Sequence, residues 1–214
     1  MKILRKIQYN SPVILTFTLL SFIALLLGMA TKEKSTYLLF SVYKSSFSDP
    51  LSYFRVFTHT LGHIDFAHFF NNFMLILLLG PMVEEKYGSL NLLLMLLFTA
   101  FITGVLHIIL FNSILLGASG IVFFLILISS YANYQKGRIP LTLILVIVIF
   151  IGREIYAAFM NDDNIAQITH IAGAFIGALS GAFLNNKVNH KKASEKDMPS
   201  PLLVKPPVEE DEEI

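Results

Sequence analysis

The sequence contains no cysteine and no tryptophan, and it is poor in charged residues. Without cysteine the chain forms no disulfide, no thiolate metal site and no cysteine nucleophile. Charged residues make up 14% of the 214 residues, whereas soluble domains carry about 25%. The formal net charge is only +1, which provides no overall field for binding nucleic acid. These shortages exclude a soluble domain and a nucleic-acid-binding protein, and they leave a membrane protein.

Hydrophobic residues make up 55% of the chain, and most of them are gathered in six long stretches. A helix needs about 20 apolar residues to cross a bilayer, and it satisfies its backbone hydrogen bonds within one segment. We therefore predict an all-α membrane protein in which residues 12–185 form a core of six transmembrane helices. The six stretches cover approximately residues 12–30, 66–83, 90–111, 119–134, 139–159 and 165–184.

The two ends of the chain differ in composition from this core. Residues 1–11 are basic, and residues 186–214 are rich in Lys, Pro and Glu, so the latter are predicted to be a disordered tail. Lys and Arg flank alternate ends of the stretches, whereas the turns at residues 111–116 and 161–164 contain neither. By the positive-inside rule, both termini are expected to be cytoplasmic, in a multi-pass protein of the cell membrane.

Two segments allow a second interpretation. The first stretch ends in Gly28-Met29-Ala30, which also fits a cleavable signal peptide. An uncut anchor is favoured, because the distribution of Lys and Arg supports an even number of spans with both ends inside. The connection at residues 31–65 is long and rich in aromatic residues. We expect it to be ordered and to lie in the outer interface, because long ordered loops are usually functional; a partly disordered loop is the alternative.

Four polar residues lie near the outer ends of predicted spans, where burying a polar group is costly and indicates function. Of these, His68 and Asn72 are four residues apart on one helix face. Both can donate hydrogen bonds to a developing negative oxygen; the alternative is that they only join helices. The third, Ser119, stands in Gly117-Ala118-Ser119-Gly120, where it is either a nucleophile at a tight turn or simply a helix N-cap.

The fourth polar residue, His170, begins a face of small residues that runs from Gly173 to Gly181 and permits close approach of another helix. If that helix begins at Ser119, the imidazole can reach the hydroxyl and act as its base; otherwise His170 is a packing residue. All four residues share one depth, because the second, fourth and sixth spans begin at the outer face. No Asp or Glu is placed to orient His170, so a Ser–His dyad is predicted rather than a triad.

Further residues accompany these four along the chain. In order, the set is Phe54-Arg55, Thr58-His59, His63, His68-x-x-x-Asn72, Gly80, Glu84, Gly88-Ser89, Gly117-Ala118-Ser119-Gly120 and Thr169-His170-Ile171-Ala172-Gly173. This ordered set, over about residues 51–181, resembles the rhomboid family of intramembrane serine proteases. The resemblance implies a six-helix bundle with a membrane-embedded Ser–His dyad and no cofactor.

The resemblance also implies a role for each polar residue. Ser119 would be the nucleophile and His170 its base, while His68, Asn72 and the Ser119 amide would stabilise the oxyanion. The implied substrates are single-pass transmembrane proteins, which are cut in or near their span, and the fifth span would form a lateral substrate gate. Oligomeric state is not implied.

Two positions differ from the common pattern of this family. Phe54 stands where Trp is frequent, although an aromatic interfacial anchor is kept. Phe123 stands where many members have a Tyr packed on the catalytic histidine. We expect the stacking to survive with Phe, while the hydroxyl is lost.

Other functions fit parts of the sequence. A non-catalytic rhomboid-fold protein would bind client transmembrane helices without cutting them, but the intact Ser119 and His170 argue against it. A small transporter would relay protons through His68 and His170, yet such proteins usually carry carboxylates at mid-membrane. A metal site at these two histidines lacks further ligands, so no metal is expected. The remaining histidines are interpreted as loop or interfacial residues: His59, His63, His107 and His190.

Overall fold

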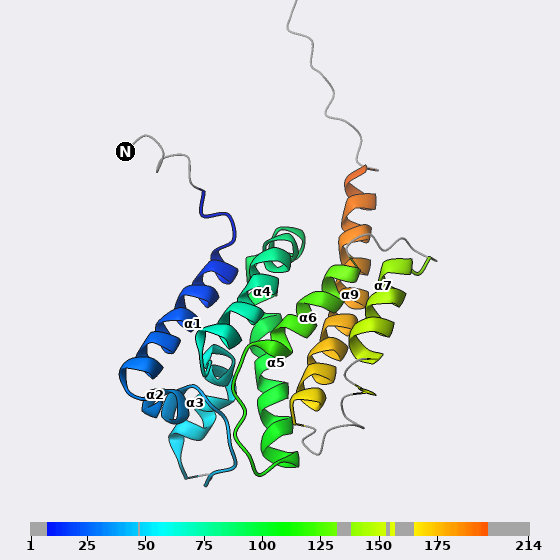
Figure 1. Ribbon diagram of the computed structural model, residues 1–214. Coiled ribbons are helices and arrows are strands. Elements are labelled where there is room, and N and C mark those ends of the chain that lie inside the picture. The colour runs from blue at the N-terminus through cyan, green and yellow to red at the C-terminus, as the bar shows by residue number, and fades with distance from the viewer. Residues whose placement is uncertain (1–7, 47, 132–137, 153–154, 157–164, 197–214) are drawn as a thin grey trace, which may run out of the picture.

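The computed structural model describes residues 8–46, 48–131, 138–152, 155–156 and 165–196. Within these ranges the protein is all-α, as predicted (Figure 1). An isolated bridge pairs Val42 with Leu115. The elements in chain order are α1 (Pro12–Ala30), α2 (Lys34–Leu39), α3 (Pro50–Thr58), the 3-10 helix η2 (His59–Leu61), α4 (Phe66–Tyr87), α5 (Ser89–Leu110), α6 (Ser119–Ser130), α7 (Leu141–Val146), the π-helix η3 (Ile147–Ile151) and α9 (Ile165–Lys196).

Four helices are long and apolar enough to cross a membrane: α1, α4, α5 and the part of α9 from Gln167 to Leu184. The other two predicted stretches contain shorter apolar helices, Ser119–Ser130 and Leu141–Ile151. The fourth stretch was predicted to continue to Tyr134, but α6 ends at Ser130, and part of the fifth lies outside the described residues. The structure therefore supports an all-α protein with four candidate spans, while the count of six stays a prediction.

At its C-terminal end α9 is longer than the sequence predicted. It continues to Lys196, so residues 186–196, which were expected to belong to the disordered tail, are helical. The cause is that extending a helix that already exists requires no new nucleation, and Lys, Ala and Glu in this segment are good helix formers. The rest of the predicted tail, residues 197–214, lies outside the described residues.

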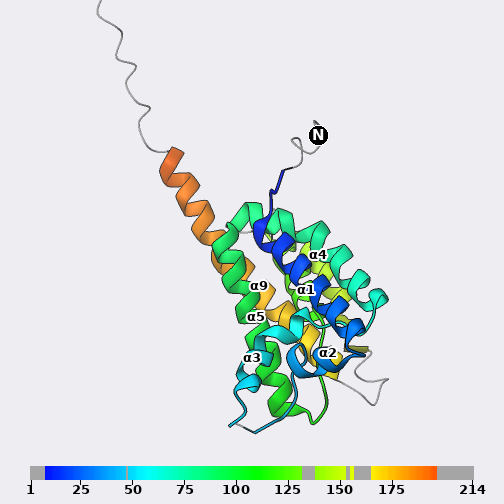
Figure 2. The ribbon, with the colours of Figure 1, turned by 90° about the vertical axis from the view of Figure 1, so that its left-hand side faces the viewer.

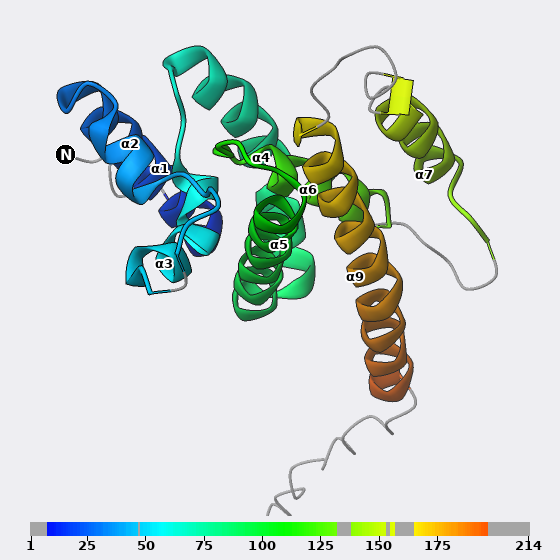
Figure 3. The same ribbon diagram turned by 90° about the horizontal axis from the view of Figure 1, so that it is seen from below.

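The hydrophobic core is centred on α6. Every residue from Gly120 to Ile128 is buried, as is typical of a helix that is apolar on all sides. Seen from below, α6 lies between α4, α5 and α9 (Figure 3), and its contact with α9 is the most extensive between any two helices described. A helix enclosed in this way can begin inside the bundle rather than at its surface.

Glycines allow α6 and α9 to touch through their backbones. A Cβ atom on Gly173 would overlap the carbonyl oxygen of Gly120, and one on Gly177 would overlap that of Phe124. Further along, Gly181 packs against the ring of Tyr131. The predicted small-residue face of the last span is therefore confirmed as a helix contact, and its partner is the helix that begins at Ser119.

A buried carboxylate fixes the start of α1. Glu84, near the end of α4, accepts hydrogen bonds from the amides of Val13 and Ile14 at 3.0 and 3.1 Å. These amides belong to the first turn of α1, and the first amides of a helix have no hydrogen-bond acceptor within that helix. The start of α1 and the end of α9 lie at the same end of the bundle (Figures 1 and 2), which agrees with an even number of crossings.

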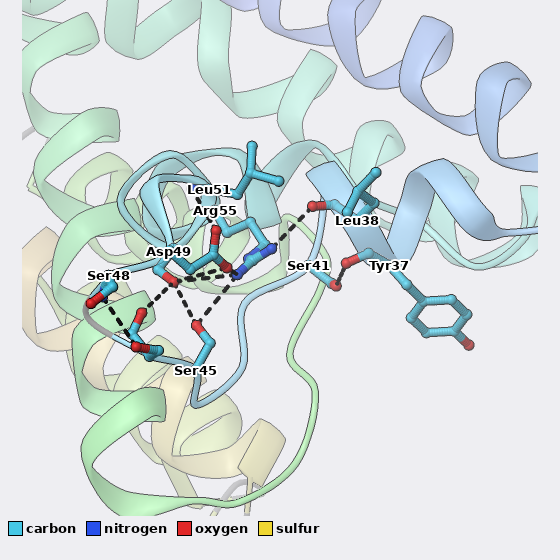
Figure 4. A network of polar contacts seen from close by, with 10 residues as sticks. Tyr37, Leu38, Ser41, Ser45, Ser48, Asp49, Leu51 and Arg55 are labelled. Carbon is cyan, nitrogen blue, oxygen red and sulfur yellow. Dashed lines mark hydrogen bonds and ion pairs between the residues drawn. The ribbon is translucent and has the colours of Figure 1, made fainter.

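At the opposite end of the bundle, the connection between α1 and α4 is folded into α2, α3 and η2. Arg55 is buried there and pairs with Asp49 (Figure 4). Its guanidinium carbon also lies 4.4 Å from the centre of the Tyr43 ring. The hydrogen bond from Arg55 lowers the pKa of Asp49. Backbone bonds between Val42 and Leu115, at 2.8 and 2.9 Å, tie this connection to the segment before α6. The described part of the connection is therefore ordered.

Candidate active site

Ser119 is the first residue of α6, the helix that contacts α4, α5 and α9. The N-cap position is taken by Ala118, and no side chain caps the helix. The interpretation of Ser119 as a simple N-cap is therefore wrong. Before it, Gly117 has φ +121°, a conformation that favours glycine. The Gly-rich tetrapeptide thus forms the predicted tight turn, which leaves the half-buried Ser119 side chain at the positive end of the α6 dipole.

The turn before Ser119 packs against both polar residues of α4. A Cβ atom on Gly117 would lie 2.8 Å from Cε1 and Nε2 of His68 and 4.0 Å from Nδ2 of Asn72. From the other side, the carbonyl of His59 accepts the Gly117 amide at 2.9 Å. His68 and Asn72 therefore converge on the turn that leads to Ser119, which is where donors to an oxyanion would have to stand.

His170 lies on the α9 face that meets α6. Its ring is stacked on Phe123, with ring centres 4.5 Å apart and ring planes 10° from parallel. Phe123 follows Ser119 by one turn of α6, and Gly173 follows His170 by about one turn of α9 at the point of contact with Gly120. The expected stacking of Phe123 on this histidine is confirmed. Two independent contacts thus hold His170 beside the first turn of α6.

The four predicted residues come from three helices and meet in one region. His68 of α4 lies close enough to His170 of α9 for the two imidazoles to interact electrostatically. His68, Ser119 and His170 are half-buried, and Asn72 is buried. The sequence alone predicted that the four residues lie at a similar depth. The contacts among α4, α6 and α9 bring them into one region of the bundle.

The structure adds His63, which the sequence interpretation assigned to a loop or interface. His63 is 1% exposed, and its Nδ1–H donates to the carbonyl of Leu61 at 3.2 Å. Its Nε2 accepts a hydrogen bond from Nδ2 of Asn72 at 3.1 Å, and its ring packs against that of His68, with ring centres 4.9 Å apart. His63 thereby orients the Asn72 amide. Helical spacing could not have shown this, because His63 precedes α4.

Two further histidines that were interpreted as loop or interfacial residues are also buried. His59 is 1% exposed, and its Nδ1–H donates to the carbonyl of Val56 at 3.0 Å. His107 is 0% exposed, and its Nε2–H donates to the carbonyl of Ser113 at 2.8 Å. His59 does lie in the connection between α1 and α4, but it is buried in η2. For His107 the interpretation is wrong, because this residue is buried within α5. In each ring one nitrogen donates to a backbone carbonyl, as buried polar groups require. The side chain of His190 lies outside the described residues.

Burial keeps the histidines of the α1–α4 connection neutral. Loss of hydration lowers the pKa of His59 to about 4. For His63, burial and then the neighbouring His68 lower the pKa to about 4. At neutral pH each ring therefore has one N–H and one lone pair, as its hydrogen bonds require.

These two pKa values predict that the fold loses stability in mild acid. Below the unfolded pKa of 6.5 the unfolded chain takes up protons, whereas folded His59 and His63 resist protonation down to about pH 4. Each histidine should therefore lower the free energy of unfolding by roughly 1.4 kcal/mol per pH unit in that window. Thermal unfolding at pH 7.5, 6 and 5 measures the slope. His63→Gln should reduce it, and an unchanged slope in that variant would contradict the assignment.

Within the described ranges, no group of three or more His, Cys, Asp or Glu side chains could hold a metal ion. The polar groups gathered at the start of α6 are a hydroxyl, imidazoles and an amide. Their arrangement suits nucleophilic attack by a serine, with a histidine nearby to take its proton.

These features define an all-α membrane protein with a serine and a histidine at the interior contact of two helices. A family profile for the Rhomboid domain matches residues 50–187, more than half of the chain. The chain therefore belongs to the rhomboid family. The matched range runs from the first residue of α3 into α9 and includes the four predicted site residues. A comparison with curated proteins gives no match.

Proposed function

We propose that the protein is an intramembrane serine endopeptidase that cuts single-pass transmembrane proteins in or near their membrane span. The observation that carries the proposal is the position of His170, which is stacked on Phe123 where Gly173 of α9 touches Gly120 of α6. This contact holds an imidazole beside the serine that opens α6. Family membership supports the same class of reaction.

In the proposed reaction, Ser119 Oγ attacks the scissile carbonyl while His170 takes the hydroxyl proton. A serine hydroxyl is a weak nucleophile until a base removes that proton. The carbon–nitrogen bond then breaks, and His170 passes the proton to the departing amine. Water attacks the resulting acyl-enzyme by the same route and releases Ser119. No carboxylate is needed to balance these steps, so a dyad is sufficient.

The negative oxygen of the tetrahedral intermediate would be held by His68, Asn72 and the amide of Ser119. Asn72 has two Nδ2 hydrogens, of which His63 accepts one, so the second can point toward the oxygen. His68 packs on Gly117, directly before the turn that carries the Ser119 amide. Hydrogen-bond donors that are already held in position stabilise the transition state most strongly where water is largely excluded.

The length of α6 supports a position for Ser119 below the membrane surface. Its 12 residues span about 18 Å at 1.5 Å per residue, against a hydrocarbon core of about 30 Å. If α6 ends at one interface, Ser119 lies well below the other. We propose that α6 and the segment containing α7 complete a six-span bundle with cytoplasmic termini, and that water reaches Ser119 from the outside.

Cleavage of a fluorescent single-span reporter in liposomes tests the proposal. The purified protein should cut the reporter, and a serine-directed fluorophosphonate should block cutting and modify Ser119, as read by peptide mass spectrometry. Reporter binding without cleavage, across several reporters with small residues in the span, would instead support a non-catalytic protein that binds client helices. Modification of a different serine together with loss of activity would overturn the assignment of the nucleophile.

A further inference from the structure

An apolar groove of about 500 Å³ lies on the side of the bundle formed by α1 and α5, under η2. Almost all of its wall is hydrocarbon, and its floor is Ile121 of α6. Its rim is open, since Leu20, Leu93 and Leu97 remain 48%, 41% and 43% exposed.

The length and surroundings of the groove fit a lipid chain. It follows α5 from Ser89 to Ala100, about 16 Å at 1.5 Å per residue, which is close to half of the hydrocarbon thickness of about 30 Å. Both walls are candidate membrane spans, so the medium at the open rim is the acyl region of the bilayer. The groove is therefore as long as one leaflet and closes where Phe57 and Leu61 cover its end.

A polar pocket, also of about 500 Å³, adjoins the other end of the groove. Ser89 lines both cavities, and Ser11 in the pocket precedes Pro12 in the groove. The remaining pocket residues are Gln8, Asn10, Pro81, Met82, Glu84, Glu85 and Gly88. An apolar channel that continues into a polar pocket at the membrane surface has the shape of a phospholipid, with its tail and its headgroup.

The charge of the pocket selects among headgroups. Among the described residues, the ionisable side chains that line it are two carboxylates, Glu84 and Glu85. Glu84 is held by the amides of α1, whereas Glu85 is exposed and can face a ligand. A headgroup with an ammonium group is attracted by this carboxylate, and an anionic glycerol headgroup is repelled. The serine hydroxyls can donate hydrogen bonds to phosphate oxygens.

We propose that this side of the bundle binds one phospholipid with a primary ammonium headgroup, such as phosphatidylethanolamine. One acyl chain fills the groove between α1 and α5, and the ammonium group pairs with Glu85. The lipid touches Ile121, two residues beyond Ser119, so it supports the helix that carries the proposed nucleophile. Binding is independent of the proposed protease activity and is measured without it.

The absence of tryptophan from the chain permits a direct test by fluorescence quenching. Leu93→Trp places the only tryptophan in the groove, and Leu94→Trp places it one residue along α5 on the 56% exposed face outside the groove. Each protein is reconstituted in equimolar phosphatidylethanolamine and phosphatidylglycerol, with bromine on the acyl chains of one lipid or the other. Quenching then reports which lipid lies beside the tryptophan.

For the Leu93→Trp protein, we expect at least about twofold stronger quenching when the bromine is on phosphatidylethanolamine, because the pocket enriches that lipid. The Leu94→Trp protein should be quenched equally by the two lipids. Adding Glu85→Gln to Leu93→Trp should remove the preference. Equal quenching in Leu93→Trp, confirmed with Leu97→Trp as a second groove position, would overturn the proposal. A preference that survives Glu85→Gln would overturn the assignment of the headgroup.

Discussion

Replacing either Ser119 or His170 by alanine should lower the rate of reporter cleavage by at least about 10⁴-fold, which in practice abolishes it. Ser119→Ala removes the atom that attacks the carbonyl. His170→Ala leaves that hydroxyl protonated and therefore non-nucleophilic. The neighbouring His68 should not replace the lost base, because it packs on Gly117 rather than on Phe123, where His170 is stacked. The double variant should be no worse than either single variant, since the two groups act in one step. Initial cleavage rates in liposomes, at equal protein, measure this.

Neither substitution should unfold the protein. Ser119 is half-buried at a helix start, and His170→Ala gives up one ring stack, worth about 0.5–1.5 kcal/mol. Ser130→Ala is a matched control, because Ser130 closes the same helix and its hydroxyl donates to the carbonyl of Ile126. That control should cleave as fast as the wild type. Cleavage that persists in folded Ser119→Ala would show that another residue is the nucleophile.

The parts of the fold that the sequence predicted well are those determined within one segment. The bounds of α1, Pro12–Ala30, agree with the prediction, because Pro opens the helix and a polar turn ends it. The glycines of α9 predicted a close helix contact, since only residues without a side chain allow backbones to touch. The sequence left the partner of that contact open, and the structure identifies it as α6, the helix that begins at Ser119.

The parts that the sequence could not predict depend on contacts between distant segments. His63 orients Asn72 only because the α1–α4 connection folds back onto α4, and no periodicity marks such a loop. His59 was interpreted as a loop or interfacial residue, yet its carbonyl accepts a hydrogen bond from the amide of Gly117, 58 residues later. Backbone acceptors are present at every residue, so sequence patterns do not reveal which one is used.

Gly117→Ala should reduce cleavage by about 10³-fold or more. The φ of +121° is strained for alanine, and the new Cβ would lie 2.8 Å from the ring of His68, so the ring or the turn must move. Loss of one oxyanion donor costs about 10²–10³ in kcat. Here the proposed donors His68 and the Ser119 amide are displaced together. The effect should fall on kcat rather than on KM, because the displaced groups contact the transition state.

Gly88→Ala separates this displacement from backbone strain. Gly88 also has a positive φ, +85°, but a Cβ there meets no atom of the described residues within 4 Å. Alanine at either position carries a strain of order 1–3 kcal/mol, so both variants should unfold at lower temperature than the wild type. Only Gly117→Ala should lose cleavage when both are assayed below their unfolding transitions. If the two variants kept the same activity, the contact between Gly117 and His68 would be structural, and the oxyanion would have to be stabilised elsewhere.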